Sequence, residues 1–144
     1  MSTLIVHTDG GSRGNPGPAA AGVVMIFEGK TLREEGLYLG AEKTNNEAEY
    51  QAVLHALKYL PSVIQELPVT SVEWRLDSML VIQQLNRKWK IKEPRMAAFA
   101  AEIWSLLKTL PVSSVFTYVP RAENAAADAV VNKTLDEVAL QKNS

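Results

Sequence analysis

Short stretches of hydrophobic residues dominate the first third of the chain, a pattern typical of β-strands. The apolar run Leu4–Val6 leads directly into Asp9, and a second run covers residues 19–28. After a Gly29-Lys30 turn, residues 31–39 return as a third stretch. Three strands joined by short turns predict an antiparallel meander.

The hydrophobic period changes to that of a helix after residue 43. Thr44 precedes Glu47 by three residues, which predicts a capping box and a helix running to about Leu60, ended by Pro61. Glu49 falls on the apolar stripe of this helix, where an ionised carboxylate needs a partner. Alternatively, Glu49 only begins the helix and stays in solvent, favoured by the helix dipole. The polar stripe consists of Glu47, Gln51, His55 and Lys58.

The second half of the chain alternates between strand-like and helix-like patterns. Residues 72–77 alternate and predict a strand that ends in Asp77. The remaining patterns predict helices over 78–86 and 94–110, a connector over 87–93, a strand over 112–119, a last helix over 125–138 capped by Asn124, and a frayed tail over 139–144. The order β-β-β-α-β-α-α-β-α indicates an α/β fold, with residues 1–144 forming one domain.

Composition narrows the class of protein. The chain of 144 residues is 47% hydrophobic and has no cysteine, which excludes disulfides and thiolate metal sites and fits a cytoplasmic protein. We recognise neither a signal peptide nor a run of about 20 apolar residues that would cross a membrane. The net charge of −1 creates no global attraction for nucleic acid, so such binding would need a local patch or metal ions.

Four acids stand out by their positions in this pattern. Asp9 and Asp77 follow predicted strands, Glu49 lies on an apolar helix stripe, and Asp128 lies in the first turn of the last helix. Ligands of open α/β sheets gather beyond the carboxyl ends of strands. Neighbouring carboxylates repel unless they are protonated or bridged by a cation. An all-oxygen ligand set favours Mg²⁺ or Mn²⁺, and a pair of such ions about 4 Å apart is a common device for phosphodiester hydrolysis.

Four motifs, in this order along the chain, resemble those of type 1 ribonuclease H. They are Thr8–Gly17, Thr44–Glu49, Leu76–Ser78 and Asn124–Asp128. The resemblance covers roughly residues 3–136 and implies a five-stranded mixed sheet in the order 3-2-1-4-5. It also implies that Asp9, Glu49, Asp77 and Asp128 are catalytic and hold two Mg²⁺ ions. Such an endonuclease cleaves the RNA strand of RNA–DNA hybrids and leaves 5′-phosphate and 3′-hydroxyl ends.

The resemblance and the basic cluster near residue 89 together predict a set of substrate contacts that read RNA 2′-hydroxyl groups or hold the DNA strand. These are Gly10, Gly11, Ser12, Arg13, Asn15, Lys43, Thr44, Asn45, Asn46, Lys88, Trp89, Lys90 and Arg121. Many members carry a histidine before the last acid, but the loop Tyr118–Glu123 has none. Its Val-Pro-Arg sequence resembles a histidine-lacking branch in archaea and some bacteria. Met79 and Glu42 also stand where other members often have a polar residue and an arginine.

The connector 87–93 contains the only dense basic cluster of the sequence, with Trp89 inside it. The cluster favours contact with a DNA strand, on which Trp89 would stack. Alternatively, the connector is solvated and Trp89 is part of the core.

Two other functions remain open at this point. The chain could be another nuclease of the same fold that acts on DNA junctions or ends, or a hybrid-binding module without catalysis. The motifs favour an RNA-strand endonuclease that acts as a monomer, without a membrane or an obligate protein partner.

Overall fold

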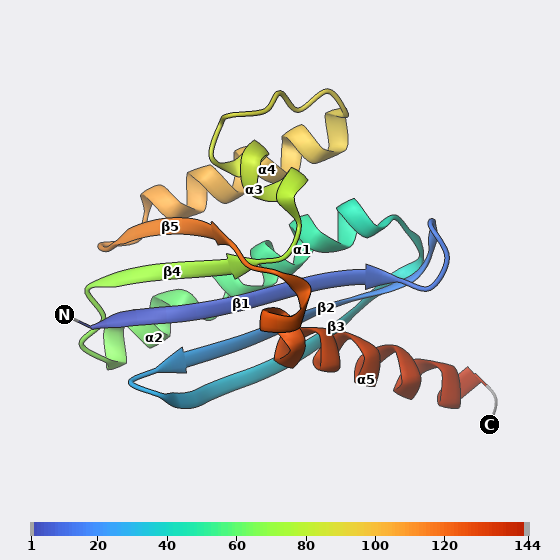
Figure 1. The fold of residues 1–144 in the computed structure, drawn as a ribbon, viewed down its shortest axis with the longest axis horizontal. Helices are drawn as coiled ribbons and strands as arrows, with labels where there is room; N and C mark the ends of the chain where they lie inside the picture. Colours follow the sequence, from blue (N-terminus) through green and yellow to red (C-terminus); the bar gives the residue numbers. More distant parts are fainter. Residues whose placement is uncertain (1, 143–144) are drawn as a thin grey trace.

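Five strands form one mixed sheet in a computed structural model of the chain, which describes residues 2–142 (Figure 1). They are β1 (Thr3–Ser12), β2 (Gly17–Phe27), β3 (Lys30–Lys43), β4 (Ser71–Leu76) and β5 (Ser113–Tyr118). Their order is β3-β2-β1-β4-β5, with β1, β2 and β3 antiparallel and β1, β4 and β5 parallel. The predicted α/β fold and strand order are therefore confirmed.

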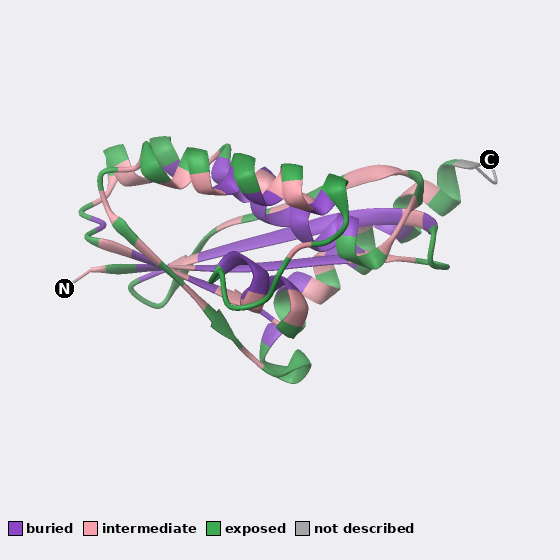
Figure 2. Cartoon of the chain, turned by 90° about the horizontal axis from the view of Figure 1, so that it is seen from above, coloured by how far each residue is buried: buried purple, intermediate pink, exposed green. Residues whose placement is uncertain are grey.

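Helices cover the two faces of this sheet unequally. They are α1 (Asn45–Leu57), α2 (Leu60–Glu66), α3 (Met79–Leu85), α4 (Pro94–Lys108), the short 3-10 helix η1 (Arg121–Asn124) and α5 (Ala125–Lys142). The main core lies between the sheet and α1, and includes the fully buried side chains of Tyr50, Val53, Trp74 and Ile103. Figure 2 shows long buried stretches in the sheet, and β2 is buried along most of its length. Helix α5 packs on β2 and β3 through a smaller cluster of Ala20, Val131 and Leu135.

The first helix is shorter than predicted, and Pro61 belongs to a second helix rather than ending the first. Helix α1 ends at Leu57, and a separate helix, α2, begins at Leu60 with Pro61 in its first turn. A proline is accommodated there because the first turn of a helix needs no backbone N–H donor. The sequence pattern missed α2 for this reason.

Several ends of elements also differ from the prediction, and β3 continues four residues further than expected, to Lys43. The first hairpin turns at Glu28 and Gly29, both with positive φ, so β3 begins one residue earlier than expected. Helix α5 continues to Lys142, so the frayed tail is wrong for residues 139–142, while 143–144 lie outside the described residues. Residues 139–142 contain no proline or glycine to stop the helix.

The composition of the polar stripe of α1 suggests exposure to solvent, but two of its residues are buried. Glu47 is 3% exposed and forms an ion pair with Arg95 of α4, at 2.8 Å. His55 is buried against the ring of Tyr59. The pairing of α1 with α4 covers Glu47, and the local sequence does not predict that long-range contact. Within residues 2–142, no helix combines the length and hydrophobicity that a membrane span needs.

Candidate active site

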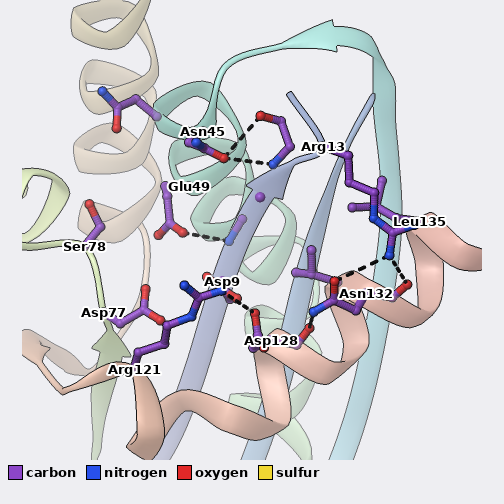
Figure 3. Close-up of a pocket in the computed structure, with 15 residues that line it drawn as sticks. Asp9, Arg13, Asn45, Glu49, Asp77, Ser78, Arg121, Asp128, Asn132 and Leu135 are labelled. Carbon is purple, nitrogen blue, oxygen red and sulfur yellow. Dashed lines mark hydrogen bonds and ion pairs between the residues drawn. The ribbon is translucent and has the colours of Figure 1, made fainter. Parts of the chain in front are cut away.

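A cleft of about 490 Å³ opens where β1 continues beyond the end of β4 (Figure 3). The pairing of β1 with β4 ends at His7 and Arg75, whereas its pairing with β2 continues to Ser12. Asp9 therefore lies inside β1 rather than at its end, contrary to the prediction. On the β4 side, however, Asp9 is beyond the last paired residue, and its side chain meets Asp77, which follows β4 directly.

Three of the four predicted acids converge at the bottom of this cleft. One carboxylate oxygen each from Asp9, Glu49 and Asp77 lies within 4.8 Å of the others. Asp9 and Glu49 are 7% and 6% exposed, so the alternative that Glu49 begins the helix in solvent is wrong. Three segments far apart in the sequence thus place their carboxylates next to one another.

Helix α1 approaches β1 closely at Gly10, which places Glu49. The backbone N–H of Gly10 donates to Glu49 Oε1 at 2.9 Å. A Cβ atom on residue 10 would lie 2.2 Å from the carbonyl carbon of Ala48, so only glycine allows this approach. Glu49 Oε2 is buried without a hydrogen-bond partner among the described residues. A buried carboxylate oxygen without a donor is a suitable ligand for a cation.

The electrostatics of the three acids also fit a divalent cation. The pKa of Asp9 is raised from its ordinary 3.8 to about 7, chiefly by burial and also by the charges of Asp77 and Asp128, whereas the neighbouring Glu49 lowers it. Burial, followed by the charge of Asp9, raises the pKa of Glu49 well above 4.5. Burial also raises the pKa of Asp77. Burial and mutual repulsion therefore disfavour the ionised forms of these acids, and a hard divalent ion would offset both effects.

These shifts predict how pH and metal affect folding stability. A carboxyl group whose pKa is higher in the folded than in the unfolded state favours folding when protonated. For Asp9 this contribution is present below about pH 3.8 and is lost as the pH rises towards about 7. In chelator, we therefore expect the acid cluster to destabilise the fold increasingly over this interval. Mg²⁺ should raise the melting temperature more at pH 8 than at pH 5, measured by differential scanning fluorimetry. An equal rise at both pH values would contradict this electrostatic account.

The fourth predicted acid, Asp128, lies at the edge of the cluster. It is in the first turn of α5 and forms an ion pair with Arg121 of η1 at 3.6 Å. Asp128 lines the cleft and raises the pKa of Asp9. It is not one of the three acids whose carboxylate oxygens lie within 4.8 Å of one another. Arg121 occupies the loop in which other members of the resembled family have a histidine.

The predicted substrate residues outside the connector divide into two groups. Gly10, Gly11, Ser12, Arg13, Asn45, Asn46 and Arg121 line the same cleft as the acids. Asn15, Lys43 and Thr44 do not line it. Asn15 Oδ1 accepts from the backbone N–H of Asn45 at 3.0 Å, and Thr44 Oγ1 accepts from that of Glu47 at 3.1 Å. These two side chains fix the start of α1 and thereby the position of Asn45.

The cleft also contains residues that the sequence analysis missed. They are Ser78, Val131, Asn132 and Leu135. Asn132 and Leu135 follow Asp128 by one and two helical turns, so helical spacing could have placed them on the same face. Arg13 reaches across to this face and donates to Asp136 Oδ1 at 2.6 Å and to the backbone oxygen of Asn132 at 3.3 Å.

Comparisons with known proteins agree with this geometry. Residues 7–134 match a family model described as reverse transcriptase-like. The chain is 39% identical over 132 residues to a ribonuclease HI of Halobacterium salinarum, covering 91% of this chain and 63% of that relative. It is 30% identical over 151 residues to a ribonuclease H of Pseudomonas entomophila, covering 95% of this chain and 96% of that protein. The chain belongs to the ribonuclease H family.

A solved structure supports the same assignment. The crystal structure of LC11-RNase H1 in complex with RNA/DNA hybrid matches 94% of this chain and 98% of its own, with 41% identity and a TM-score of 0.87. The chain spans only 63% of the halobacterial relative's length, and 36% of the mycobacterial relatives'. For those longer relatives, the similarity concerns the ribonuclease H portion.

The basic connector of this ribonuclease H lies apart from the acid cleft. Trp89 is 48% exposed, so the alternative that it belongs to the core is wrong. A second, smaller hollow of about 310 Å³ is lined by Gln84, Arg87, Trp89, Ile91, Ala97 and Trp104. The guanidinium of Arg87 stacks 3.7 Å from the Trp104 ring centre. Arg95 is held by Glu47 and Glu93. The exposed Lys88, Lys90 and Lys92 therefore carry the charge available to an anion.

Proposed function

We propose that this chain is an endonuclease that hydrolyses the RNA strand of RNA–DNA hybrids. Asp9, Glu49, Asp77 and Asp128 would hold two divalent ions when substrate is bound, Mg²⁺ or alternatively Mn²⁺. The observation that carries the proposal is the meeting of three acids from β1, α1 and the end of β4 within 4.8 Å. Relatives named ribonuclease HI and the similar structure with a hybrid support the substrate.

The chain's residues supply position and charge for this reaction. Bound divalent ions would polarise the attacking water and neutralise the charge that develops on the leaving 3′ oxygen. Gly10 N–H holds Glu49 Oε1, which leaves Oε2 as a ligand. Arg121, beside Asp128, is exposed and positively charged at the rim, where it can contact a phosphate. The reaction breaks the bond from phosphorus to the 3′ oxygen and leaves the water oxygen on the 5′-phosphate.

Recognition of the RNA strand would depend on the backbone of β1 and the start of α1. Asn45 Oδ1 accepts from Ser12 N–H at 2.9 Å, which orders the rim of the cleft beside the acids. This rim offers small residues and amide groups beside the acids. The 2′-hydroxyl is both a donor and an acceptor, and it distinguishes RNA from DNA at such a site.

One set of substrates tests the proposal against its alternatives. We expect cleavage of uniformly labelled RNA in a hybrid with Mg²⁺, and none in chelator or on a DNA duplex or junction. Binding of the hybrid without cleavage in either Mg²⁺ or Mn²⁺ would indicate a binding module. Preferential cleavage of DNA junctions would indicate another nuclease of this fold.

The lysines of the connector should provide its electrostatic contact with nucleic acid. We expect Lys88→Ala with Lys90→Ala to weaken hybrid binding and to reduce the slope of log K against log salt by roughly 0.9 per lost phosphate contact. Turnover at saturating hybrid should change little. Binding of the hybrid at several salt concentrations measures the slope. Lys133→Ala, an exposed charge change on α5, is the comparison, and an equal slope in both variants would show that the connector faces away from the substrate.

Trp89→Ala separates packing from binding. Because Trp89 is 48% exposed, we expect the free energy of unfolding to change by less than the ~3–5 kcal/mol that truncation of a buried tryptophan costs. Hybrid affinity should fall, since an exposed aromatic ring can stack on a base or pack on a sugar. Chemical denaturation and hybrid titration give the two quantities. Loss of stability with unchanged affinity would contradict this role.

A further inference from the structure

The side chain of Asn124 is turned into the protein and connects three segments of the acid cluster. It was predicted to cap α5, but it is the last residue of η1 and its side chain bonds to β1 instead, and the residue is 1% exposed. Asn124 Nδ2 donates to the backbone oxygen of Thr8 at 2.9 Å, and Asn124 Oδ1 lies 2.8 Å from His7 Nδ1. The Asn124 amide also lies near the Asp77 carboxylate and lowers the pKa of Asp77 against the larger, opposite effect of burial.

The hydrogen bonds of the Asn124 amide determine which ring nitrogen of His7 carries a hydrogen. A backbone carbonyl only accepts, so the Asn124 amide must direct Nδ2 to Thr8 and Oδ1 to His7. Oδ1 also only accepts, and therefore His7 Nδ1 must carry a hydrogen. In the neutral ring, Nε2 is then the unprotonated nitrogen. His7 lies two residues before Asp9. It thus holds the Asn124 amide in the orientation that directs Nδ2 to the Thr8 carbonyl, beside Asp77.

We propose that His7 and Asn124 form a positioning pair that holds Asp77 and the start of α5 in place relative to Asp9. Asn124 immediately precedes α5 and lies four residues before Asp128. Through its hydrogen bonds to β1 and its place beside Asp77, it joins the segments that carry Asp9, Asp77 and Asp128. Without the His7 donor, the amide can rotate, give up its bond to Thr8 and move away from Asp77. The inference rests on the proposed function for its kinetic test only.

Substitutions of His7 distinguish positioning from packing. His7→Leu removes the donor, while His7→Asn places an amide N–H at about the position of Nδ1. We expect His7→Leu to lower kcat and Mn²⁺ affinity by roughly 10-fold to 100-fold, as for other residues that orient metal ligands. KM for the hybrid should stay near that of the wild type. His7→Asn should restore both kcat and metal affinity to within about threefold of the wild type.

His55→Leu is the matched control, because His55 is also 8% exposed but lies on α1 against Tyr59, outside the cleft. It should change the melting temperature without changing kcat or Mn²⁺ affinity. Equal kcat and metal affinity in the two leucine variants would overturn the positioning role. So would failure of His7→Asn to restore activity while it folds normally.

The ring nitrogens of His7 give a test that does not depend on activity. Long-range ¹H–¹⁵N spectra distinguish the two neutral forms of a histidine ring, in which either Nδ1 or Nε2 carries the hydrogen. We expect the Nδ1–H form for His7, and the Nε2–H form would overturn the inference even if His7→Leu does not fold. If the wild-type chain cuts no hybrid, the proposed function fails, while the Mn²⁺ titration and the nitrogen spectra still decide the positioning pair.

Discussion

Asp9→Asn is expected to lower the rate of hybrid cleavage by several orders of magnitude while hybrid binding stays near that of the wild type. Asp9 is buried at the centre of the acid cluster and interacts electrostatically with Glu49, Asp77 and Asp128. Asparagine keeps the shape and one oxygen, so the fold should remain. It removes the charge that would hold two cations at one point, and those cations act mainly on the transition state. Affinity for the hybrid can rise slightly, since the repulsion of phosphate decreases.

Single-turnover cleavage and hybrid titration measure these two effects. Glu102→Gln makes the same change from carboxylate to amide at an exposed position of α4 and should leave the rate unchanged. Asp128→Asn should have a smaller effect than Asp9→Asn, because Asp128 lies at the edge of the cluster beside Arg121. Cleavage by Asp9→Asn within about tenfold of the wild type, about 1.4 kcal/mol in barrier, would contradict the assignment.

Gly10→Ala is expected to damage both folding and catalysis. The new Cβ would lie 2.2 Å and 2.3 Å from the carbonyl carbon and oxygen of Ala48, and 2.4 Å from the backbone nitrogen of Glu49. These are backbone atoms, so α1 itself must move away from β1. Overpacking usually costs about 1–3 kcal/mol, and we expect a loss of at least ~3 kcal/mol here. The movement displaces Glu49, and a 1 Å misplacement can reduce the rate by about 100-fold.

Gly11→Ala is the matched comparison for stability. Its Cβ would meet only Val131 Cγ1, at 3.5 Å, which is an ordinary contact. We expect its free energy of unfolding to stay within about 1 kcal/mol of the wild type. Denaturation in urea measures both variants. Similar stability of the two would mean that α1 and β1 are not in the close contact described.

Local patterns were sufficient to single out the acids, but they did not predict the tertiary contacts of the residues around them. Glu49 was predicted because its helical spacing placed a carboxylate on an apolar stripe, and it is buried. Asp77 was predicted from the alternation of residues 72–77, and it follows β4 directly. The strand order was implied by a resemblance rather than by spacing, since β1 pairs with β4 across more than 60 residues of sequence.

The failures arose where a distant segment decides the local environment. The sequence places Glu47 on a polar, surface-facing stripe, but in the structure Arg95 of α4 covers it. Asn124 reads as a helix cap, but its amide bonds to β1 instead. Trp89 could have been core or surface, because the connector around it has no regular hydrophobic period. Each case depends on tertiary contacts that propensity and period do not contain.

The chemistry at phosphorus can be tested directly in ¹⁸O-enriched water. Hybrid cleaved by the wild-type chain with Mg²⁺ would be analysed by mass spectrometry of the RNA products. If the acids hold ions that activate water, the new 5′-phosphate must carry ¹⁸O and the other product must end in a 3′-hydroxyl. A 2′,3′-cyclic phosphate with a 5′-hydroxyl would show that the substrate's own 2′-hydroxyl attacks, and would contradict the mechanism.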